Sequence, residues 1–453
     1  MSYPLIGGHR FFIHLVNRKC MKTKMTILLS LLLLLLPFFG HAQWSTDRLS
    51  EARWELAACK VGDQLLFAGG FRLTPFGHSK RVDIYHTATG TWSVDSLSEA
   101  RDEMAAAASG SLAFFVGSSG IGSIARVMDI YDASTGTWQQ ETLPKVTGLK
   151  SIVISGDQVF VAGGDYIDIY DIPSEQWLDS HPLDRPRGLM AAVSMGDKVL
   201  FAGGFDGYLA DRLNTVDIYD RTTDQWTQDS LSQDRSGVAA VVLDNKAYFA
   251  GGVKDDYDVS DRIDVYDGAT GTWTTASLGT PRSAIAAVVI RDRLFFVGGR
   301  GNNGEGNFDL IEIYDPRTDE WRTDQLSEGR HSMGAVVDGD RAYFAGGDLP
   351  IGASDLVDIY DATLTGLTPV AAGGTVSVFP NPATDYCYLD LPTALEGQTF
   401  ELVLYAADGR LVRQMPQQIT TPTPVATAAL EPGVYLLELR RGAARYTGRL
   451  VVE

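Results

Sequence analysis

Arginine recurs at one position in the repeated part of this chain, and a guanidinium group at a fixed position can hold an anion. The residues that share this position, each just before a small apolar stretch, are Arg53, Arg101, Arg187, Arg235, Arg282 and Arg330. In one copy Leu149 stands there instead. Gathered into a ring, these groups would suit a carboxylate or another anion, because a guanidinium offers several donors in a rigid fork. We therefore treat them as candidate ligand-binding residues.

A structural use of the same arginines is the competing interpretation. Aspartates recur as well, among them Asp83, Asp217 and Asp264, and an Arg–Asp pair in each copy would fix its strands together. Glu55 and Glu103 follow two of the arginines by two residues, so strand alternation would point them the same way and make two copies locally acidic.

Further candidates lie in the segments that follow paired glycines, which vary in length and chemistry while their flanking stretches hardly change. Variable segments on a regular scaffold commonly carry the binding function. The candidates there are Tyr166, Phe205, Tyr208, Tyr257 and Arg300. Residues 255–261 could offer oxygen ligands to calcium. They lack the Gly and terminal Glu of an EF-hand, so a solvated acidic loop is favoured and no metal is expected.

The residue types of common catalytic sites give little support for an enzyme. The histidines beyond residue 42 are scattered: His78, His86, His181 and His331. There is no Ser-His-Asp grouping, Walker loop or HExxH motif. The cysteines, Cys20, Cys59 and Cys387, suggest neither a disulfide framework nor a Cys-rich metal site. We expect no catalytic residue and no cofactor; the enzyme question stays open, with a non-enzymatic role favoured.

All these candidates are embedded in a repeat that must position them. Gly pairs fall at 69/70, 163/164, 203/204, 251/252, 298/299 and 346/347, with Gly117-Ser118 filling the one gap. A tyrosine and then a tryptophan follow, at Tyr85 and Trp92 in the first copy, and successive copies of this tryptophan lie 39 to 49 residues apart. Alternating apolar residues broken by Gly, Asp and Asn predict four short strands per copy. Such a unit cannot bury both faces alone, so copies must stack around an axis.

The order of paired glycine, tyrosine and tryptophan resembles the kelch repeat, and no Trp is followed by Asp as in WD40 repeats. The resemblance implies an all-β fold, a seven-bladed kelch-type β-propeller over residues 43–361. It also implies that the segments after the glycine pairs share one face with those leading into the innermost strands. The seventh copy lacks its Trp, while Trp44 stands alone before the first copy. We therefore predict that residues 43–45 form the outer strand of the last blade and close the ring.

Residues 1–42 are typical of a leader that contains a secretory signal peptide. Lys22 and Lys24 precede an apolar run over residues 25–39, and small residues end at Ala42. The run is too short and too early for a membrane-spanning helix, so no membrane insertion is expected once it is removed. Residues 1–20 fit no part of that layout, which favours translation from Met21 or Met25.

After residue 361 the period stops. Residues 362–375 have the composition of a linker, and residues 376–453 predict a small C-terminal β-sandwich. Several short sequence motifs there resemble the C-terminal sorting domain of type IX secretion cargo: Pro380, Asn381 and Pro382, then Asp408 and Gly409, then Gly433 and Tyr435. The resemblance implies the type IX machinery as a partner and export across the outer membrane of a Gram-negative bacterium. An ordinary adhesive sandwich is the alternative.

Charge excludes one class of function. The 453 residues carry 38 Lys and Arg against 57 Asp and Glu, a net charge of −19, which repels nucleic acids and anionic membranes. We predict a monomeric propeller, secreted or on the outer-membrane surface, that binds a glycan or a protein. The alternative is an extracellular carbohydrate-active enzyme, such as a kelch-type epimerase or oxidase, whose arginine ring would hold a substrate carboxylate.

Overall fold

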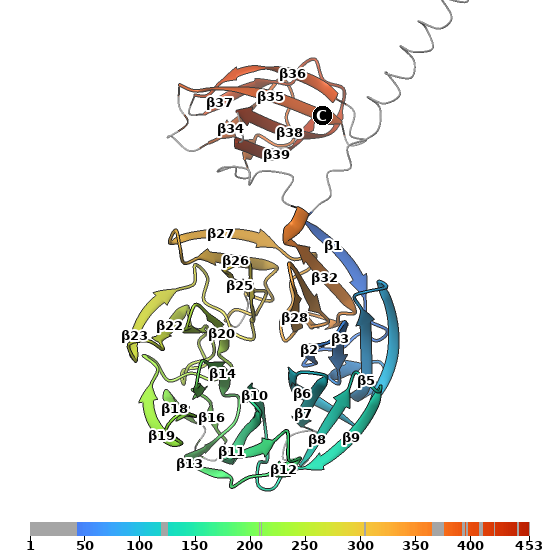
Figure 1. Ribbon diagram of the computed structural model, residues 1–453. Coiled ribbons are helices and arrows are strands. Elements are labelled where there is room, and N and C mark those ends of the chain that lie inside the picture. Colours follow the sequence, from blue (N-terminus) through green and yellow to red (C-terminus); the bar gives the residue numbers. More distant parts are fainter. Residues whose placement is uncertain are drawn as a thin grey trace, which may run out of the picture. The chain divides into compact units, whose positions relative to one another are not determined.

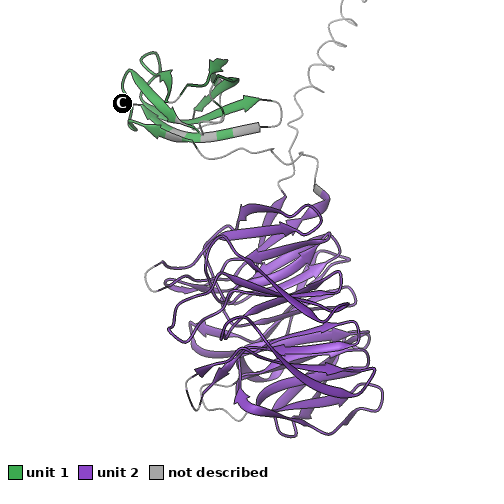
Figure 2. Ribbon diagram, turned by 90° about the vertical axis from the view of Figure 1, so that its left-hand side faces the viewer, with its two compact units in different colours: residues 1–41, 366–453 green, residues 42–365 purple. Residues whose placement is uncertain are grey.

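The computed structural model describes residues 43–364 and 376–452, apart from gaps at 119–125, 208, 210, 303–304, 392–394, 396, 407–410, 421 and 442–443. The expected signal peptide, both candidate start residues and most of the expected linker lie outside the described residues. The chain divides into two compact units, residues 42–365 and residues 1–41 with 366–453 (Figure 2). No helix in the described ranges is long and apolar enough to cross a membrane.

Each copy of the repeat consists of antiparallel strands that follow one another in the chain, except that β1 completes the last copy; the long strand β6 runs through the first two copies and joins them in one sheet. From the innermost strand outward in each case, the first copy holds β2 (Ala57–Val61), β3 (Gln64–Ala68), β5 (Phe76–His86) and the first part of β6 (Thr91–Ser109), and the second holds the rest of β6, β7 (Leu112–Ser118), β8 (Val127–Asp132) and β9 (Thr137–Thr142). The third holds β10 (Ser151–Ser155), β11 (Gln158–Asp171), β12 (Gln176–Trp177) and β13 (His181–Arg187), and the fourth holds β14 (Ala191–Met195), β15 (Lys198–Ala202), β18 (Thr215–Asp220) and β19 (Gln225–Ser230). The fifth holds β20 (Ala239–Leu243), β21 (Lys246–Ala250), β22 (Arg262–Asp267) and β23 (Thr272–Ser277), and the sixth holds β24 (Ala286–Ile290), β25 (Arg293–Val297), β26 (Leu310–Asp315) and β27 (Glu320–Gln325). The seventh holds β28 (Gly334–Asp338), β29 (Arg341–Ala345), β32 (Leu356–Asp361) and β1 (Trp44–Arg48). A short 3-10 turn, η1 (Ala362–Leu364), follows β32.

The sheets stand around a common axis (Figure 1). Their innermost strands contact one another in the order β2, β6, β10, β14, β20, β24 and β28, and β28 contacts β2 again. The second strands, such as β15, are the most buried, since both of their faces pack against neighbouring sheets. This explains why these strands read as continuous apolar runs rather than as alternating ones.

The first strand of the described chain belongs to the last sheet. β1 pairs with β32 in antiparallel register, with Trp44 opposite Tyr360, and the Asp361 N–H donates to the Gln43 carbonyl at 2.8 Å. The pairing that the unmatched Trp44 predicted is therefore confirmed.

One end of the larger unit carries the connections between second and third strands. These include β4 (Phe71–Leu73), which pairs with β5, and the hairpins β16 (Phe205–Asp206) with β17 (Asp211–Arg212) and β30 (Asp348–Leu349) with β31 (Gly352–Ala353). Isolated bridges join the residue after a glycine pair to the segment leading into the innermost strand, as between Trp54 and Phe71. We call this end the hairpin face.

Glycine is required where these two segments meet. Gly70 has φ 103°, and a Cβ there would lie 2.6 Å from the Trp54 carbonyl oxygen. A side chain would therefore suffer both backbone strain and a clash with the main chain.

The described part of the smaller unit forms two sheets over one apolar core. One holds β33 (Ser377–Phe379), β34 (Tyr386–Asp390) and β37 (Thr423–Ala426); the other holds β35 (Thr399–Ala406), β36 (Leu411–Gln418), β38 (Gly433–Arg441) and β39 (Ala444–Val452). Leu389 from the first sheet and Leu404 and Leu437 from the second are fully buried in that core.

Candidate functional site

The recurrent arginines do not face a ligand, so their assignment as ligand-binding residues is wrong. Each has at most 2% of its surface exposed. Each guanidinium instead forms an ion pair with an acid on the third strand of the copy whose innermost strand comes next in the chain: Arg53 with Asp83, Arg101 with Asp129, Arg187 with Asp217, Arg235 with Asp264, Arg282 with Glu312 and Arg330 with Asp358. The structural alternative is the correct one.

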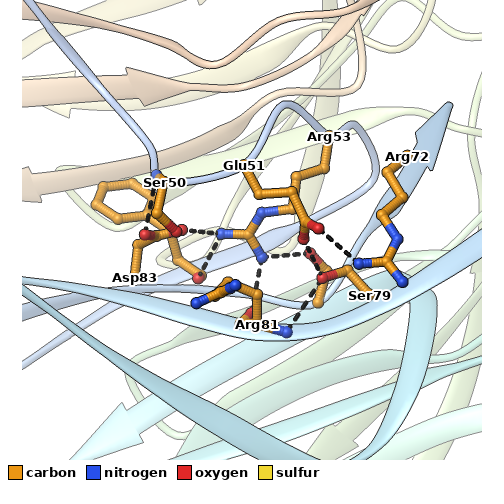
Figure 3. A network of polar contacts seen from close by, with 9 residues as sticks. Ser50, Glu51, Arg53, Arg72, Ser79, Arg81 and Asp83 are labelled. Carbon is orange, nitrogen blue, oxygen red and sulfur yellow. Dashed lines mark hydrogen bonds and ion pairs between the residues drawn. The ribbon is translucent and has the colours of Figure 1, made fainter. Parts of the chain in front are cut away.

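Figure 3 shows this network in the first copy. Besides its pairing with Asp83, Arg53 donates through Nη1 to the carbonyls of Gly69 and Arg81, both at 2.7 Å. The Ser50 N–H donates to the other carboxylate oxygen of Asp83 at 3.0 Å. Arg53 thus ties together the segment before β2, the end of β3 and the middle of β5, which is a bracing role.

The rest of this network reaches the hairpin face. Glu51 accepts hydrogen bonds from Arg72 Nη1 and from Ser79 Oγ, each at 2.6 Å (Figure 3). Because Arg72 lies on β4 and Ser79 on β5, one carboxylate fixes both strands of that hairpin to the braced core.

In the copy without an arginine, the acid on the third strand is hydrogen-bonded by two main-chain N–H groups and a hydroxyl instead of a guanidinium. Asp168 accepts the backbone N–H groups of Lys145 at 3.0 Å and Val146 at 2.8 Å, and the Ser180 hydroxyl at 2.5 Å. The acid is therefore satisfied without a cation, and no such contact is made by Leu149.

Tryptophans link neighbouring sheets near the outer edge. The indole N–H groups donate to acids of the preceding sheet: Trp44 to Asp324, Trp92 to Asp47, Trp138 to Asp95, Trp177 to Glu141 and Trp273 to Asp229. The distances run from 2.7 to 3.3 Å. The Tyr and Trp of the repeat are therefore scaffold.

A group of ionisable residues lies on the hairpin face instead. Two of its members, Glu55 and Glu103, have the left-handed φ values of 56° and 45°. The main chain links it across the sheets, since Glu55 N–H donates to the Ser332 carbonyl and Met104 N–H donates to the Glu55 carbonyl. We call it the ionisable cluster, and its members are Glu55, His78, Asp102, Glu103, Lys150, Arg300, His331 and Asp348.

Glu55 and Glu103 were expected to point the same way as the arginines, and they do not. The alternation argument assumed an extended strand, but Glu55 precedes β2 and Glu103 sits where the pairing of β6 with β7 shifts register. Both have left-handed φ, so the backbone turns between each Arg and its Glu. Arg53 is buried while Glu55 is only partly so.

The acids of the cluster are hard to ionise together. Burial raises the pKa of Glu55 to about 7, and the like charges of Glu103 and Asp102 add to this. Burial, followed by the charge of Asp102, raises the pKa of Glu103 to about 7. Burial also raises the pKa of Asp348. The pKa values of Glu55 and Glu103 therefore lie near neutral pH.

For two basic groups of the cluster, His331 and Lys150, burial lowers the pKa. Burial, followed by the charge of Arg300, lowers the pKa of His331 to about 4, so its Nε2, 3.3 Å from Asp348 Oδ2, belongs to a neutral ring at pH 7. Burial lowers the pKa of Lys150 to about 8, and its Nζ donates to the carbonyls of Gly117 and Gly148. The predicted residue Arg300 is an exposed member of this cluster.

The other predicted contact residues are separated. Tyr166 is half-buried on β11 with Lys145 Nζ 4.7 Å from its ring centre. Phe205 and Tyr257 come together around Arg212, whose guanidinium carbon lies 5.2 Å and 4.5 Å from their ring centres. Tyr208 lies outside the described residues. Arg212 was not singled out in the sequence, because nothing there marks it as the group between two rings.

Large apolar side chains are exposed at the hairpin tips, and most of them were not among the candidates from the sequence. Phe76 is 77% exposed, Leu209 65%, Tyr257 70% and Ile351 94%. Only Tyr257 was a candidate. The sequence does not single them out, because each connection also holds other apolar residues, such as Leu73 near Phe76 and Leu349 near Ile351.

Two of the acids in residues 255–261 already accept hydrogen bonds within the chain. Asp255 accepts the Arg212 N–H at 2.6 Å, and Asp256 accepts the Asp258 N–H at 3.1 Å. Among the described residues, no group of three or more His, Cys, Asp or Glu is arranged to hold a metal ion.

The sorting residues that can be seen are structural in the smaller unit. Asn381 Oδ1 accepts the Val451 N–H at 2.8 Å, and the Tyr435 hydroxyl donates to the Glu431 carbonyl at 2.6 Å. Pro380 and Pro382 flank Asn381, Gly433 begins β38, and Asp408 and Gly409 lie outside the described residues.

Comparison with known proteins agrees with this architecture. A model of the kelch motif matches residues 186–229 and 281–323. A model of the secretion system C-terminal sorting domain matches residues 377–453. The chain therefore carries kelch motifs and, at its C-terminus, a type IX sorting domain, which points to export.

Two curated relatives are similar to a part of this chain. Kelch-like protein 4 of Homo sapiens is 34% identical over 80 residues, which is 17% of this chain and 11% of the relative. The Kelch repeat and BTB domain-containing protein F47D12.7 of Caenorhabditis elegans is 30% identical over 90 residues, 18% of this chain and 15% of the relative. The matches thus span a small part of either relative.

Proposed function

We propose that this chain is an exported, seven-bladed kelch propeller that binds a protein partner through its hairpin face. The observation that carries the proposal is the set of apolar side chains, Phe76, Leu209, Tyr257 and Ile351, exposed at the tips of the connections. Large apolar and aromatic groups exposed on one face commonly mark an interaction surface, and each of these four comes from a different copy of the repeat. The closed circuit of innermost strands supports the blade count, and the C-terminal unit is proposed to be a β-sandwich.

Tyr257 is the best-fixed of these side chains. The Arg212 guanidinium packs over its ring, and its turn is closed by the Tyr257 N–H, which donates to the Lys254 carbonyl at 3.0 Å. A ring that is 70% exposed yet held in place loses little conformational entropy on binding.

The sorting domain and the predicted signal peptide support export to the medium or to the outer-membrane surface of a Gram-negative cell. The proposed layout is a leader over residues 1–42, the propeller over 43–361, a linker over 362–375 and the sorting domain over 376–453. A glycan is the other candidate ligand, and a monomer is the proposed state.

A capture experiment from the native extracellular fraction tests the binding proposal. Full-length protein is compared with a variant carrying Phe76→Ser, Leu209→Ser, Tyr257→Ser and Ile351→Ser. The control is Val94→Ser on β6, which is 47% exposed and lies away from the connections. Proteins captured by the wild type and the control but not by the variant support the proposal; equal capture by all three contradicts it.

A carbohydrate-active enzyme is the second candidate. The observation that favours it is the raised pKa of Glu55 and Glu103, because a general acid works best with a pKa near the working pH. Turnover of an oligosaccharide by the wild type, lost in both Glu55→Gln and Glu103→Gln, would establish this reading; binding without turnover would exclude it.

A further inference from the structure

A cavity of about 720 Å³ opens between the third and fourth copies of the repeat, away from the hairpin face. Its lining includes Asp157 from the β10–β11 turn and Asp224 from the β18–β19 turn. In a sheet whose strands follow one another up and down, these turns lie at the end opposite the connections between second and third strands. The cavity is therefore separate from the ionisable cluster.

The cavity coincides with a break in the repeat. Trp177 lies opposite Tyr170, but His181 rather than Ser180 lies opposite Ile167, so the outer strand carries one extra residue. The strand β12 is only two residues long as a result, whereas β19 has six. Such a bulge locally disrupts pairing and redirects side chains.

In the bulged register an imidazole ring stands at the position where most other copies have a carboxylate. Opposite the residue equivalent to Ile167, most other copies place the acid that accepts the next tryptophan, as Asp229 does opposite Val216 for Trp273. Here His181 holds that position and stacks on Trp226, with ring centres 3.9 Å apart and planes 6° apart. Burial lowers the pKa of His181, which favours the neutral ring.

The Trp226 indole N–H is consequently left without an acceptor in the part of the chain that the structure describes, and Trp226 lines the cavity. Around it the walls mix both kinds of hydrogen-bonding group with apolar surface. Carboxylates come from Asp157, Asp171, Asp179 and Asp224, a guanidinium from Arg221, and apolar surface from Leu178.

We propose that this cavity binds a short saccharide that is neutral or carries an amino group. Sugar hydroxyls both donate and accept, so they match carboxylates, a guanidinium and an indole N–H in one wall, and the C–H face of a sugar suits the His181 and Leu178 surface. The volume lies within the range of small-molecule sites. Several carboxylates against one guanidinium exclude acidic sugars and phosphorylated ligands.

The site is independent of the proposed protein-binding face, and the chain supplies matched controls for it. Asp224 and Asp319 occupy the same position in two copies, with φ 55° and 56°, and each accepts a tyrosine hydroxyl, from Tyr219 and Tyr314. Only Asp224 lines the cavity. Trp321 likewise makes no carboxylate hydrogen bond within the described residues, because Ala276 stands opposite Ile263 where the acid would be.

The experiment is saturation-transfer NMR and calorimetry on the full chain, with neutral oligosaccharides, glucosamine oligomers, uronic acid oligomers and a lysine-rich peptide as probes. We expect binding of the first two only. Asp224→Asn should weaken it about tenfold, as for loss of one hydrogen bond to a charged group. Leu178→Trp should weaken it by narrowing the cavity, and Trp226→Phe should weaken it as well. Asp319→Asn, Trp321→Phe and the fourfold hairpin variant should bind as the wild type does. Binding of the peptide alone, equal binding of uronic acids, or equal losses in Asp224→Asn and Asp319→Asn would each overturn the proposal.

Discussion

The indole N–H of Trp44 donates to Asp324 Oδ2 at 2.7 Å, across 280 residues of sequence. The strand that carries Trp44 also carries Asp47, which accepts the indole N–H of Trp92 at 2.8 Å. β1 therefore carries both a donor and an acceptor of the indole–carboxylate hydrogen bonds that join neighbouring sheets. It connects the last sheet to both of its neighbours.

Trp44→Phe should lower the free energy of unfolding by about 1 kcal/mol, because it removes the hydrogen bond to Asp324 and keeps most of the packing. Urea denaturation followed by fluorescence measures this. Trp321→Phe serves as the control and should change stability by less than about 0.5 kcal/mol, since that ring is partly exposed and has no carboxylate acceptor in the described chain. Equal losses in both variants would show that the bond to Asp324 contributes nothing.

Arg235→Ala should destabilise the larger unit by about 3–5 kcal/mol, because it leaves Asp264 buried without its cation. Thermal and urea unfolding are the measurements. The exposed Arg300→Ala should be close to neutral in stability. If Arg235→Ala were as stable as Arg300→Ala and instead lost ligand binding, the arginine would be a ligand contact after all.

Stability should fall as the pH rises through the range set by Glu55 and Glu103. Their folded pKa of about 7 lies above the ordinary 4.5, so the folded state holds their protons more tightly and their contribution is lost above pH 7. Glu55→Gln with Glu103→Gln should gain about 1–2 kcal/mol at pH 8 relative to pH 5, compared with the wild type. The exposed Glu320→Gln is the control and should leave the pH profile unchanged.

Removal of residues 377–453 should stop export, because the sorting domain is what the secretion machinery recognises. Immunoblots of medium, cell surface and cell interior after the deletion measure this, with the full chain as reference. A truncated chain that still reached the medium would refute type IX export for this protein.

Calcium should leave the melting temperature unchanged. Asp255 already accepts the Arg212 N–H, and Asp256 accepts the Asp258 N–H and lies 3.3 Å from Lys254 Nζ, so these oxygens are committed within the chain. Scans with calcium and with a chelator provide the measurement. A rise in melting temperature that Asp258→Asn removes would reveal a metal site.

Sequence patterns predicted the parts of the fold that repeat. Gly70, Tyr85 and Trp92 recur because each copy needs the same close approach of two backbone segments and the same cross-strand pair of rings. The pairing of β1 with β32 followed from a missing Trp in one place and an extra Trp in another. The arginine–aspartate pairs were visible as one of two interpretations, since both residues recur at fixed positions.

The candidate site was less predictable, because it depends on departures from the repeat that leave little trace in residue type. The left-handed φ of Glu55 reverses the expected direction of its side chain. One extra residue between Trp177 and His181 opens a cavity, yet in the sequence it changes only a spacing. The pKa of Glu103 depends on burial and on Asp102, which only the folded chain brings about.

The position of β1 has a mechanical consequence. Trp44 at the start of β1 lies opposite Tyr360 near the end of β32, so the two chain ends leave the sheet at the same end of one ladder. A force applied between residues 43 and 362 loads the rungs of that ladder one at a time, beginning at Trp44, rather than shearing all of them together. The larger unit should therefore yield at low force by peeling of its first strand, while the sheets braced by buried arginines stay intact.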